Sequence, residues 1–476
     1  MRFDSDFTMT IGGESAVSPE TFNVVNPANE NIVGVSPRAS QGQLDEAVAA
    51  ARAAFPAWAA TPLAARQALV AQLGGLLAAN VEPLKRLLTS EQGKSHADAA
   101  MEIMGAALWC QSIATQDIPE TINEDSEVRL SRTRHVPLGV VAAISPWNYP
   151  LMLSMWKVAA ALCAGNTIVL KPSPFTPLTC LKMGELAREL LPPGVLNVIA
   201  GGDELGPWLT SHAGIDKIAF TGSTATGKKV METASRDLKR VTLELGGNDA
   251  AIVMPDVDLE TIAPQLFWSA FTNNAQLCVA SKRMYVHADI YARFKTALVD
   301  YAKTVKVGDG AEQGAQLGPV QNRAQYDRVI ELLDDAKAAG LTFLMGGDPD
   351  RAAPGYFVPI TIIDNPPDDA RVVREEAFGP ILPLLKFDDI DDVVRRANDT
   401  IYGLAGSVWS RDLDKALEIA SRLQTGTVWI NEAQHLWPNA PFAGHKQSGM
   451  GVENGIEGLL EYTVPQTITI KRTVAA

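Results

Sequence analysis

The chain has 476 residues, of which 46% are hydrophobic and 20% charged, and its 55 acidic against 41 basic residues give a net charge of −14 at pH 7. This is an ordinary globular composition, which excludes a disordered, collagen-like or disulfide-stapled chain, and the length predicts two or three domains. Because a negative surface repels phosphate backbones, we expect no nucleic-acid partner.

No segment has the pattern of an export signal or a membrane span. Residues 1–14 include acidic side chains and no apolar core. The longest apolar runs, 138–144 and 158–164, are much shorter than the about 18 residues that a membrane helix needs. The cysteines show no metal-like spacing; they are Cys110, Cys163, Cys180 and Cys278. We therefore expect reduced thiols, no metal and a cytoplasmic protein without a membrane partner.

The first half of the chain changes from a purely helical pattern to one in which strands alternate with helices. Apolar residues recur at helical spacing between 41 and 112, for example at Leu44, Ala47 and Val48. Beyond residue 138, predicted strands alternate with predicted helices; the strands are 140–144, 167–170, 195–199, 217–220 and 241–243, and the helices are 150–164, 177–191, 204–210 and 223–235. This order predicts a doubly wound parallel α/β sheet, with functional residues just beyond the carboxyl ends of its strands.

A second block, 247–446, again mixes strands and helices; the strands are 251–254, 284–286 and 427–430, and the helices are 291–305, 325–339 and 413–423. Two further segments, 127–135 and 467–472, alternate apolar and polar residues outside either block. Strands of this kind pair with each other or with a second subunit.

Cys278 is the cysteine with the most unusual surroundings. The ordinary interpretation of a cytosolic cysteine is a small buried hydrophobic residue. Amide side chains surround Cys278, however, at Asn273, Asn274 and Gln276. That polar setting favours a partly exposed thiol that can ionise and act as a nucleophile.

Other polar side chains follow the predicted strands. Glu244 comes directly after a strand and before a glycine pair, so it is either a solvated charge or a buried base with a raised pKa. Asn148 lies between Pro146 and Pro150, where its amide can donate to an oxyanion or simply form part of a turn. Lys171 ends another strand and is either a surface lysine or a cofactor contact.

The segment 220–228 follows a strand and opens a helix, with Ser223 as the predicted N-cap. Free amides at such a helix start bind phosphate groups, although an ordinary capped turn has the same pattern. A P-loop is excluded because Lys229 replaces the required hydroxyl residue, and no complete GxGxxG fingerprint occurs.

Together these segments resemble the aldehyde dehydrogenase superfamily of NAD(P)-dependent enzymes. The matching motifs run in family order along nearly the whole chain: PWNYP at 146–150, KPS at 171–173, FTGSTATG at 220–227, ELGG at 244–247, AQLC at 275–278, EEAFGP at 375–380, WIN at 429–431 and PFAGHKQSG at 441–449. Each motif is weak alone, whereas eight in order leave little room for chance.

The resemblance implies catalytic roles. Cys278 matches the nucleophile that attacks the aldehyde and later carries a thioester, and Asn148 matches the oxyanion donor. Glu244 matches the base that activates water, and Glu453 matches a carboxylate that relays protons. Positions that match cofactor contacts for NAD or NADP are Trp147, Lys171, Ser173, Gly222, Ser223, Gly227, Leu245, Glu376 and Phe378.

The resemblance also implies a substrate tunnel of apolar and aromatic residues: Tyr149, Leu153, Trp156, Leu277, Val279, Leu436, Trp437 and Phe442. Because none of these is basic, we expect neutral, apolar or aromatic aldehydes rather than semialdehyde acids. His435 is the one polar neighbour that complicates this expectation.

Two positions depart from the family pattern. Ala275 replaces the usual glycine before the nucleophile, and Pro174 replaces the glutamate by which many NAD-preferring relatives bind the adenosine ribose. Without that carboxylate, we expect both NAD and NADP to be used, with weak discrimination.

The fold that the resemblance implies has a Rossmann-like cofactor domain (1–117 and 138–246), an α/β catalytic domain (247–446) and a small β oligomerisation arm with a tail (118–137 and 447–476). A homodimer or homotetramer is expected. The competing predictions are a CoA-acylating dehydrogenase, a non-catalytic crystallin-like relative and a thiol hydrolase. The retained Glu244, Cys278 and Asn148 argue against the first two, and the absence of a recognisable histidine partner argues against the third.

Overall fold

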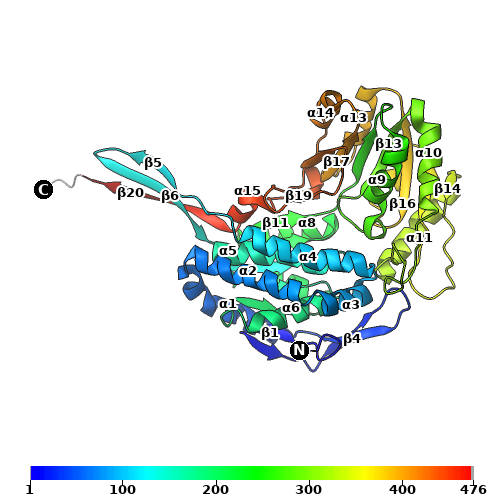
Figure 1. Cartoon of the computed structure of the whole chain (residues 1–476). Helices are drawn as coiled ribbons and strands as arrows, with labels where there is room; N and C mark the ends of the chain where they lie inside the picture. The colour runs from blue at the N-terminus through cyan, green and yellow to red at the C-terminus, as the bar shows by residue number, and fades with distance from the viewer. Residues whose placement is uncertain (1, 473–476) are drawn as a thin grey trace.

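The computed structural model describes residues 2–472 as a two-lobed body from which a narrow arm projects (Figure 1). The chain opens with two short hairpins, β1 (Met9–Ile11) with β2 (Glu14–Ala16) and β3 (Thr21–Val25) with β4 (Ile32–Pro37). Four helices follow: α1 (Gln41–Ala60), α2 (Leu63–Ala79), α3 (Val81–Gln92) and α4 (His96–Ile113). Ser40 and Gln43 form a capping box that starts α1. The region predicted to be helical, residues 41–112, therefore forms four helices.

The first lobe contains an eight-stranded sheet whose centre is parallel. Its central strands lie in the order β11 (Arg240–Glu244), β10 (Lys217–Thr221), β7 (Val140–Ile144), β8 (Thr167–Lys171), β9 (Leu196–Val198). The intervening helices are α5 (Pro150–Ala164), α6 (Leu178–Arg188), α7 (Leu205–Ser211) and α8 (Thr224–Ser235). Strands β1 and β19 (Gly449–Met450) run antiparallel at the two sides. The predicted doubly wound α/β fold is confirmed, and fully buried β7 and β8 explain the continuous apolar runs.

The second lobe has a seven-stranded sheet that is parallel except at β14. Its strands lie in the order β14 (Phe343–Met345), β15 (Thr361–Asp364), β16 (Ile381–Phe387), β13 (Ser281–His287), β12 (Asp249–Val253), β17 (Ala405–Trp409), β18 (Thr427–Ile430). The helices of this lobe are α9 (Leu259–Phe271), α10 (Ala288–Ala302), α11 (Arg323–Ala338), α12 (Arg371–Arg374), α13 (Ile390–Asn398) and α14 (Leu413–Ala420). The chain crosses between the lobes at residues 245–248, directly after β11.

The arm is a three-stranded antiparallel sheet in the order β20 (Thr463–Lys471), β6 (Arg129–Pro137), β5 (Thr121–Asp125). Strands β6 and β20, which are more than 300 residues apart, pair along their whole length. The two alternating segments noted in the sequence therefore pair with each other within one chain. Between the arm and the second lobe, the tail also supplies β19 and the short helix α15 (Gly455–Leu460) to the first lobe (Figure 1).

Within residues 2–472, no helix combines the length and apolarity required to cross a lipid bilayer.

Candidate active site

The loop that carries Cys278, the predicted nucleophile, connects α9 to β13; this segment, residues 272–280, is called the nucleophile loop. Asn273, Asn274 and Ala275 adopt φ values of 52°, 58° and 60°, a left-handed run that is uncommon for residues with side chains. The Gln276 amide fixes this coil by donating to Asn273 O and to Pro319 O. Ala275 thus occupies a backbone conformation that favours glycine, so the departure from the family pattern falls at a strained position.

The Cys278 thiol is partly exposed, as predicted, but its pKa is raised to about 12. Burial is the main cause, and the carboxylates of Glu244, Asp249 and Glu376 raise it further, while the Lys282 ammonium lowers it. The nearby amides Asn273 and Gln276 bond to backbone carbonyls instead of solvating the sulfur. With a pKa this high, the thiol is protonated near neutral pH.

Asn148 lies beside this loop, at the carboxyl end of β7. Its Nδ2 donates to Gln276 O at 3.0 Å, which leaves one amide proton for a ligand. Its own backbone carbonyl accepts from Lys94 Nζ at 2.8 Å, and Lys94 is paired with Glu102 at 2.5 Å in a fully buried ion pair. Glu102 also accepts from the backbone N–H of Leu151 at the start of α5. Lys94, in the loop between α3 and α4, and Glu102 of α4 therefore position the Asn148 turn.

Glu244 ends β11, the strand beside β10 and β19. Among the described residues its Oε1 has no hydrogen-bond partner, and its pKa lies well above the ordinary value. Burial is the main cause; Glu453 raises it further and Lys157 lowers it. Lys157 forms a buried ion pair with Glu453, with Nζ 2.7 Å from Oε1. The raised pKa expected of a water-activating base is therefore present.

Two adjoining cavities lie along the carboxyl edge of the first sheet. The larger, of about 370 Å³, is lined by Lys171, Ser173 and Pro174. The other, of about 330 Å³, is lined by Leu245, Cys278, Glu376 and Phe378. Trp147, Gly222 and Ser223 line both, as the resemblance predicted for cofactor contacts; Gly227 lines neither, because it packs under Leu245, whose side chain would collide with a Cβ at Gly227.

One helix start and two side chains in these cavities are available to a ligand. Ser223 caps α8 by accepting from Thr226 N, so the helix start faces the shared region. The buried Thr221 Oγ1 has no partner among the described residues. Lys171 is 5% exposed, and Nζ contacts only Pro172 O at 3.3 Å. These groups fit an extended ligand with hydroxyl and phosphate groups.

Sequence reasoning missed other residues that line the two cavities. Asp203 and Lys229 line the larger one, and Gln325 and Arg328 line the other. Asp203, Gln325 and Arg328 lie outside the motifs noted in the sequence, and Lys229 was noted only as the residue that breaks the P-loop pattern. Asp203 is notable because it supplies a carboxylate to the cavity in which Pro174 replaces the family's glutamate.

A third, small apolar cavity of about 30 Å³ meets the second at Cys278 and Asn148. Six predicted tunnel residues line it: Tyr149, Leu153, Trp156, Leu277, Leu436 and Phe442. Glu244 also reaches it.

Two predicted tunnel residues do not line this cavity. Val279 is buried in the surrounding apolar cluster. Trp437 is 50% exposed and stacks on His435, with ring centroids 6.0 Å apart. Two residues that were not predicted also belong here: Met152 lines the cavity, and Trp109 of α4 stacks on Trp156 with ring centroids 5.2 Å apart.

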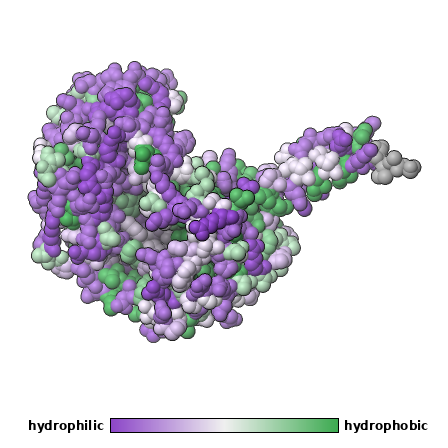
Figure 2. All heavy atoms as spheres, turned by 180° about the vertical axis from the view of Figure 1, so that it is seen from behind, coloured by the Kyte–Doolittle hydropathy of each residue, from purple (hydrophilic) through white to green (hydrophobic). Residues whose placement is uncertain are grey.

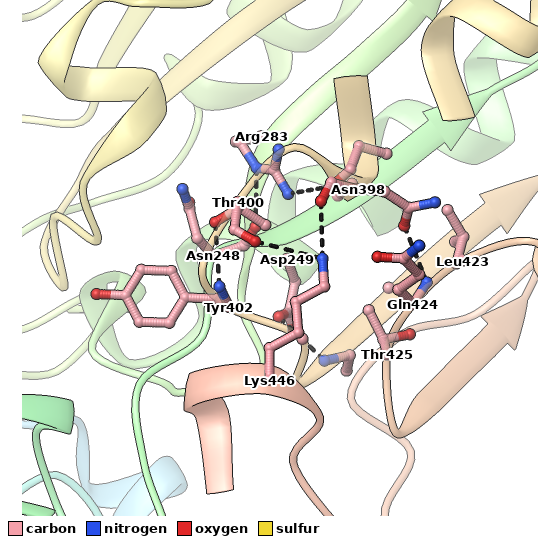
Figure 3. Close-up of a pocket in the computed structure, with 15 residues that line it drawn as sticks. Asn248, Asp249, Arg283, Asn398, Thr400, Tyr402, Leu423, Gln424, Thr425 and Lys446 are labelled. Carbon is pink, nitrogen blue, oxygen red and sulfur yellow. Dashed lines mark hydrogen bonds between the residues drawn. The ribbon is translucent and has the colours of Figure 1, made fainter. Parts of the chain in front are cut away.

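A separate polar network supports the crossing between the lobes (Figure 3). Arg283 donates from Nε to Asn248 O at 2.8 Å, and Lys446 Nζ donates to Asn398 O at 2.7 Å. The space among these residues, about 10 Å³, holds at most about one water molecule. It is a structural support and not a substrate site.

A doubly wound sheet with a phosphate-type helix start, next to a cysteine and a buried carboxylate, is the arrangement of a dinucleotide-type enzyme. The family model described as "Aldehyde dehydrogenase family" matches residues 14–468, and the chain belongs to that family. The predicted enzyme class, an NAD(P)-dependent aldehyde oxidoreductase, is therefore confirmed.

Relatives with known names match nearly the whole chain. The chain is 42% identical to a probable aldehyde dehydrogenase from Pseudomonas sp., covering 99% of this chain and 96% of that protein. It is 40% identical to human retinaldehyde dehydrogenase 3, covering 95% and 90%. The NAD+ complex of an aldehyde dehydrogenase from Bacillus cereus superposes with a TM-score of 0.96 at 38% identity, covering 99% and 98% of the two chains.

Proposed function

We propose that this enzyme oxidises a neutral, apolar or aromatic aldehyde to its carboxylic acid, through a thioester on Cys278 that water hydrolyses. The observation that carries the proposal is the shared wall of two cavities. Cys278 and Asn148 line both the cofactor-side cavity and the small apolar cavity, which Glu244 also reaches. Nucleophile, oxyanion donor and base therefore surround one reaction volume.

In the first stage the Cys278 thiolate forms a bond to the aldehyde carbon, and the carbonyl electron pair moves to oxygen. The free proton of the Asn148 amide and the Cys278 backbone N–H stabilise that oxyanion. When the carbonyl reforms, a hydride leaves carbon, and the bound nicotinamide supplies its acceptor. A thioester on Cys278 remains.

In the second stage Glu244 takes a proton from water as the water oxygen bonds to the thioester carbon. Collapse of this adduct breaks the C–S bond, releases the acid and restores the thiolate. A buried carboxylate with a raised pKa is a stronger base than a solvated one, which suits this step. The Lys157–Glu453 pair behind Glu244 offers a route for the proton to leave.

The two larger cavities fit an NAD(P) cofactor. We propose that Lys171 and Ser173 hold the adenosine ribose, that Ser223 and the start of α8 hold the pyrophosphate, and that Glu376 and Phe378 hold the nicotinamide half. The Bacillus cereus relative, determined as an NAD+ complex, supports this proposal.

The small cavity supports the substrate class. Among the residues found to line it, none is Lys or Arg, and most are apolar or aromatic. A substrate carboxylate buried there has no cation to pair with, which costs several kcal/mol. The relatives' names range from retinaldehyde to betaine aldehyde dehydrogenase, so they do not select one aldehyde.

The test follows formation of reduced nicotinamide without CoA, with NAD or NADP, against aliphatic, aromatic and carboxylated aldehydes. We expect turnover that favours uncharged aldehydes and disappears in Cys278→Ala. Turnover only with added CoA supports the acylating alternative instead. Comparable kcat/KM for succinic semialdehyde and an aromatic aldehyde contradicts the proposed substrate class.

Cofactor selectivity gives a second test. We propose that both NAD and NADP are used, because Pro174 leaves the adenosine cavity without the family's glutamate. Pro174→Glu is expected to raise the NAD-over-NADP ratio of kcat/KM roughly tenfold by repelling the 2′-phosphate. Asp203→Asn is expected to shift the ratio towards NADP. A wild-type preference for NAD of a hundredfold or more contradicts the proposal.

We further propose that the predicted division into cofactor domain, catalytic domain and arm is correct, and that the arm joins subunits into a homodimer or homotetramer. Exposed apolar side chains on the arm support this, among them Ile122, Val128 and Ile470 (Figure 2). All four cysteines are free thiols, which supports a cytoplasmic location.

A further inference from the structure

Lys282, the second residue of β13, is almost completely buried and contacts three parts of the active site at once. It is 6% exposed. Its Nζ donates to Leu277 O at 2.9 Å and to Cys278 O at 2.7 Å, both in the nucleophile loop. The same nitrogen lies 3.1 Å from Glu376 Oε1 and 5.7 Å from the centre of the Phe378 ring.

The neighbouring residue in the strand shows that this placement is specific. Successive side chains of a strand point to opposite faces. Arg283 accordingly points into the polar network of Figure 3, where it bonds only to backbone carbonyls and a tyrosine hydroxyl, at 2.8–3.3 Å. Lys282 points the other way, towards Cys278.

Glu376 ties this contact to the loop between the lobes. Its Oε1 also accepts from Gly247 N at 3.2 Å, and its Oε2 occupies the space that a Cβ on Gly246 would need. The Cys278 carbonyl lies 2.7 Å from the equivalent point on Gly247. Lys282, Glu376, the glycine pair and the nucleophile loop therefore pack as one unit.

We propose that Lys282 is a positioning residue that couples the two halves of the reaction, by holding the nucleophile loop and the ribose-binding carboxylate Glu376 on one ammonium group. It keeps Glu376 aimed into the cofactor cavity, and its positive charge favours ionisation of Cys278. This inference deepens the proposed function and relies on it for the roles of Cys278 and Glu376.

Burying an ammonium group costs several kcal/mol unless its donors are satisfied. Two backbone carbonyls accept hydrogen bonds from Lys282, and the Glu376 carboxylate pairs with its charge at 3.1 Å. The charged groups that act on Cys278 are Lys282, Glu244, Asp249 and Glu376. Among these Lys282 is the only cation, so its removal leaves the thiol facing carboxylates alone.

The test uses two readouts that need no aldehyde: the rate at which iodoacetamide alkylates Cys278 at pH 8, assigned by peptide mass spectrometry, and the dissociation constant of NAD+. In Lys282→Met, which keeps the length of the side chain, we expect alkylation to slow roughly tenfold and NAD+ binding to weaken roughly tenfold. Lys282→Arg is expected to recover much of both losses.

The direction of the alkylation change separates this role from a merely structural one. A loosened loop exposes the thiol and speeds alkylation, whereas loss of the cation slows it. Lys415→Met is the matched control, since Lys415 forms an exposed pair with Glu418 at 2.8 Å; it is expected to behave as the wild type. Faster or unchanged alkylation in Lys282→Met, with NAD+ affinity within about twofold of the wild type, overturns the inference.

If Lys282→Met does not fold, the double variant Lys282→Met/Glu376→Gln is used instead. It removes both charges of the Lys282–Glu376 pair, so neither is left buried without its partner. This double variant is compared with Glu376→Gln alone. We expect the double variant to be alkylated more slowly than Glu376→Gln; equal rates overturn the inference. Failure of the wild type to oxidise any aldehyde overturns the proposed function, while the alkylation result for Lys282 stands separately.

Discussion

At the scale of single residues, the site is governed by buried charge. Burial raises the pKa of Glu244, and the charge of Glu453 raises it further, while Oε1 of Glu244 has no hydrogen-bond partner among the described residues. The same low-dielectric setting raises the pKa of Cys278. Burial thus disfavours the charged forms of both Glu244 and Cys278.

Glu244→Gln separates the two stages of the reaction. Because thioester formation does not need this base, a first-turnover burst of reduced nicotinamide is expected to remain, while steady turnover falls about 10²–10⁴-fold. In the wild type, steady turnover is expected to rise with pH as Glu244 loses its proton; in the variant this rise is lost.

Rapid-mixing absorbance measures the burst, and intact-mass spectrometry detects the acyl group on the enzyme. The exposed Glu418→Gln is the control. Loss of both the burst and the acyl adduct in Glu244→Gln contradicts the assigned role.

At the scale of elements, the start of β12 connects the lobe crossing to the second sheet. Asp249 Oδ1 accepts from Ala405 N at the start of β17, at 3.1 Å, and burial raises the pKa of Asp249 to about 7. The crossing loop, with Gly246 and Gly247, is therefore anchored to the second sheet by an acid that retains its proton up to about neutral pH.

Asp249→Asn tests this linkage. The folded protein binds the Asp249 proton more tightly than the unfolded chain, so this group stabilises the fold below about pH 4 and loses its contribution as pH rises through about 7. The substituted amide is uncharged and keeps an oxygen for Ala405 N. We therefore expect the variant to gain free energy of unfolding relative to the wild type on going from pH 5 to pH 8, by at most a few kcal/mol.

Urea denaturation at the two pH values measures the difference. The exposed Asp300→Asn, in a surface pair with Lys303, is the control. A wild-type-to-variant difference in stability that is the same at pH 5 and pH 8 contradicts the shifted pKa.

At the scale of the whole molecule, the arm stands apart, because the hydrophobic cores of the two lobes do not require it. It projects from the first lobe as three antiparallel strands (Figures 1 and 2). Within the described chain, β5 and β20 each pair on one side only. Such edges, with apolar side chains beside them, are surfaces that pair with another chain.

The double variant Ile122→Glu/Ile470→Glu places charges on both outer strands of the arm. We expect a lower oligomeric mass by light scattering, with the secondary structure of the body retained in circular dichroism. Val17→Glu changes an exposed apolar residue outside the arm and is expected to leave the mass unchanged. An unchanged mass in the arm variant contradicts an interface there.

The sequence by itself determined the doubly wound fold, and it predicted polar side chains that the structure brings to the carboxyl edge of the first sheet. Strand and helix periods are local, and Asn148, Lys171 and Glu244 each end or follow a strand, so a pattern of a few residues is enough to find them. Only the tertiary structure decided which buried charged side chains contact these residues and hold them in place. Lys94 bonds to a carbonyl 54 residues away, and Lys157 pairs with a carboxylate 296 residues away. A buried lysine looks in sequence like a surface one, because the partners that offset its desolvation come from distant parts of the chain.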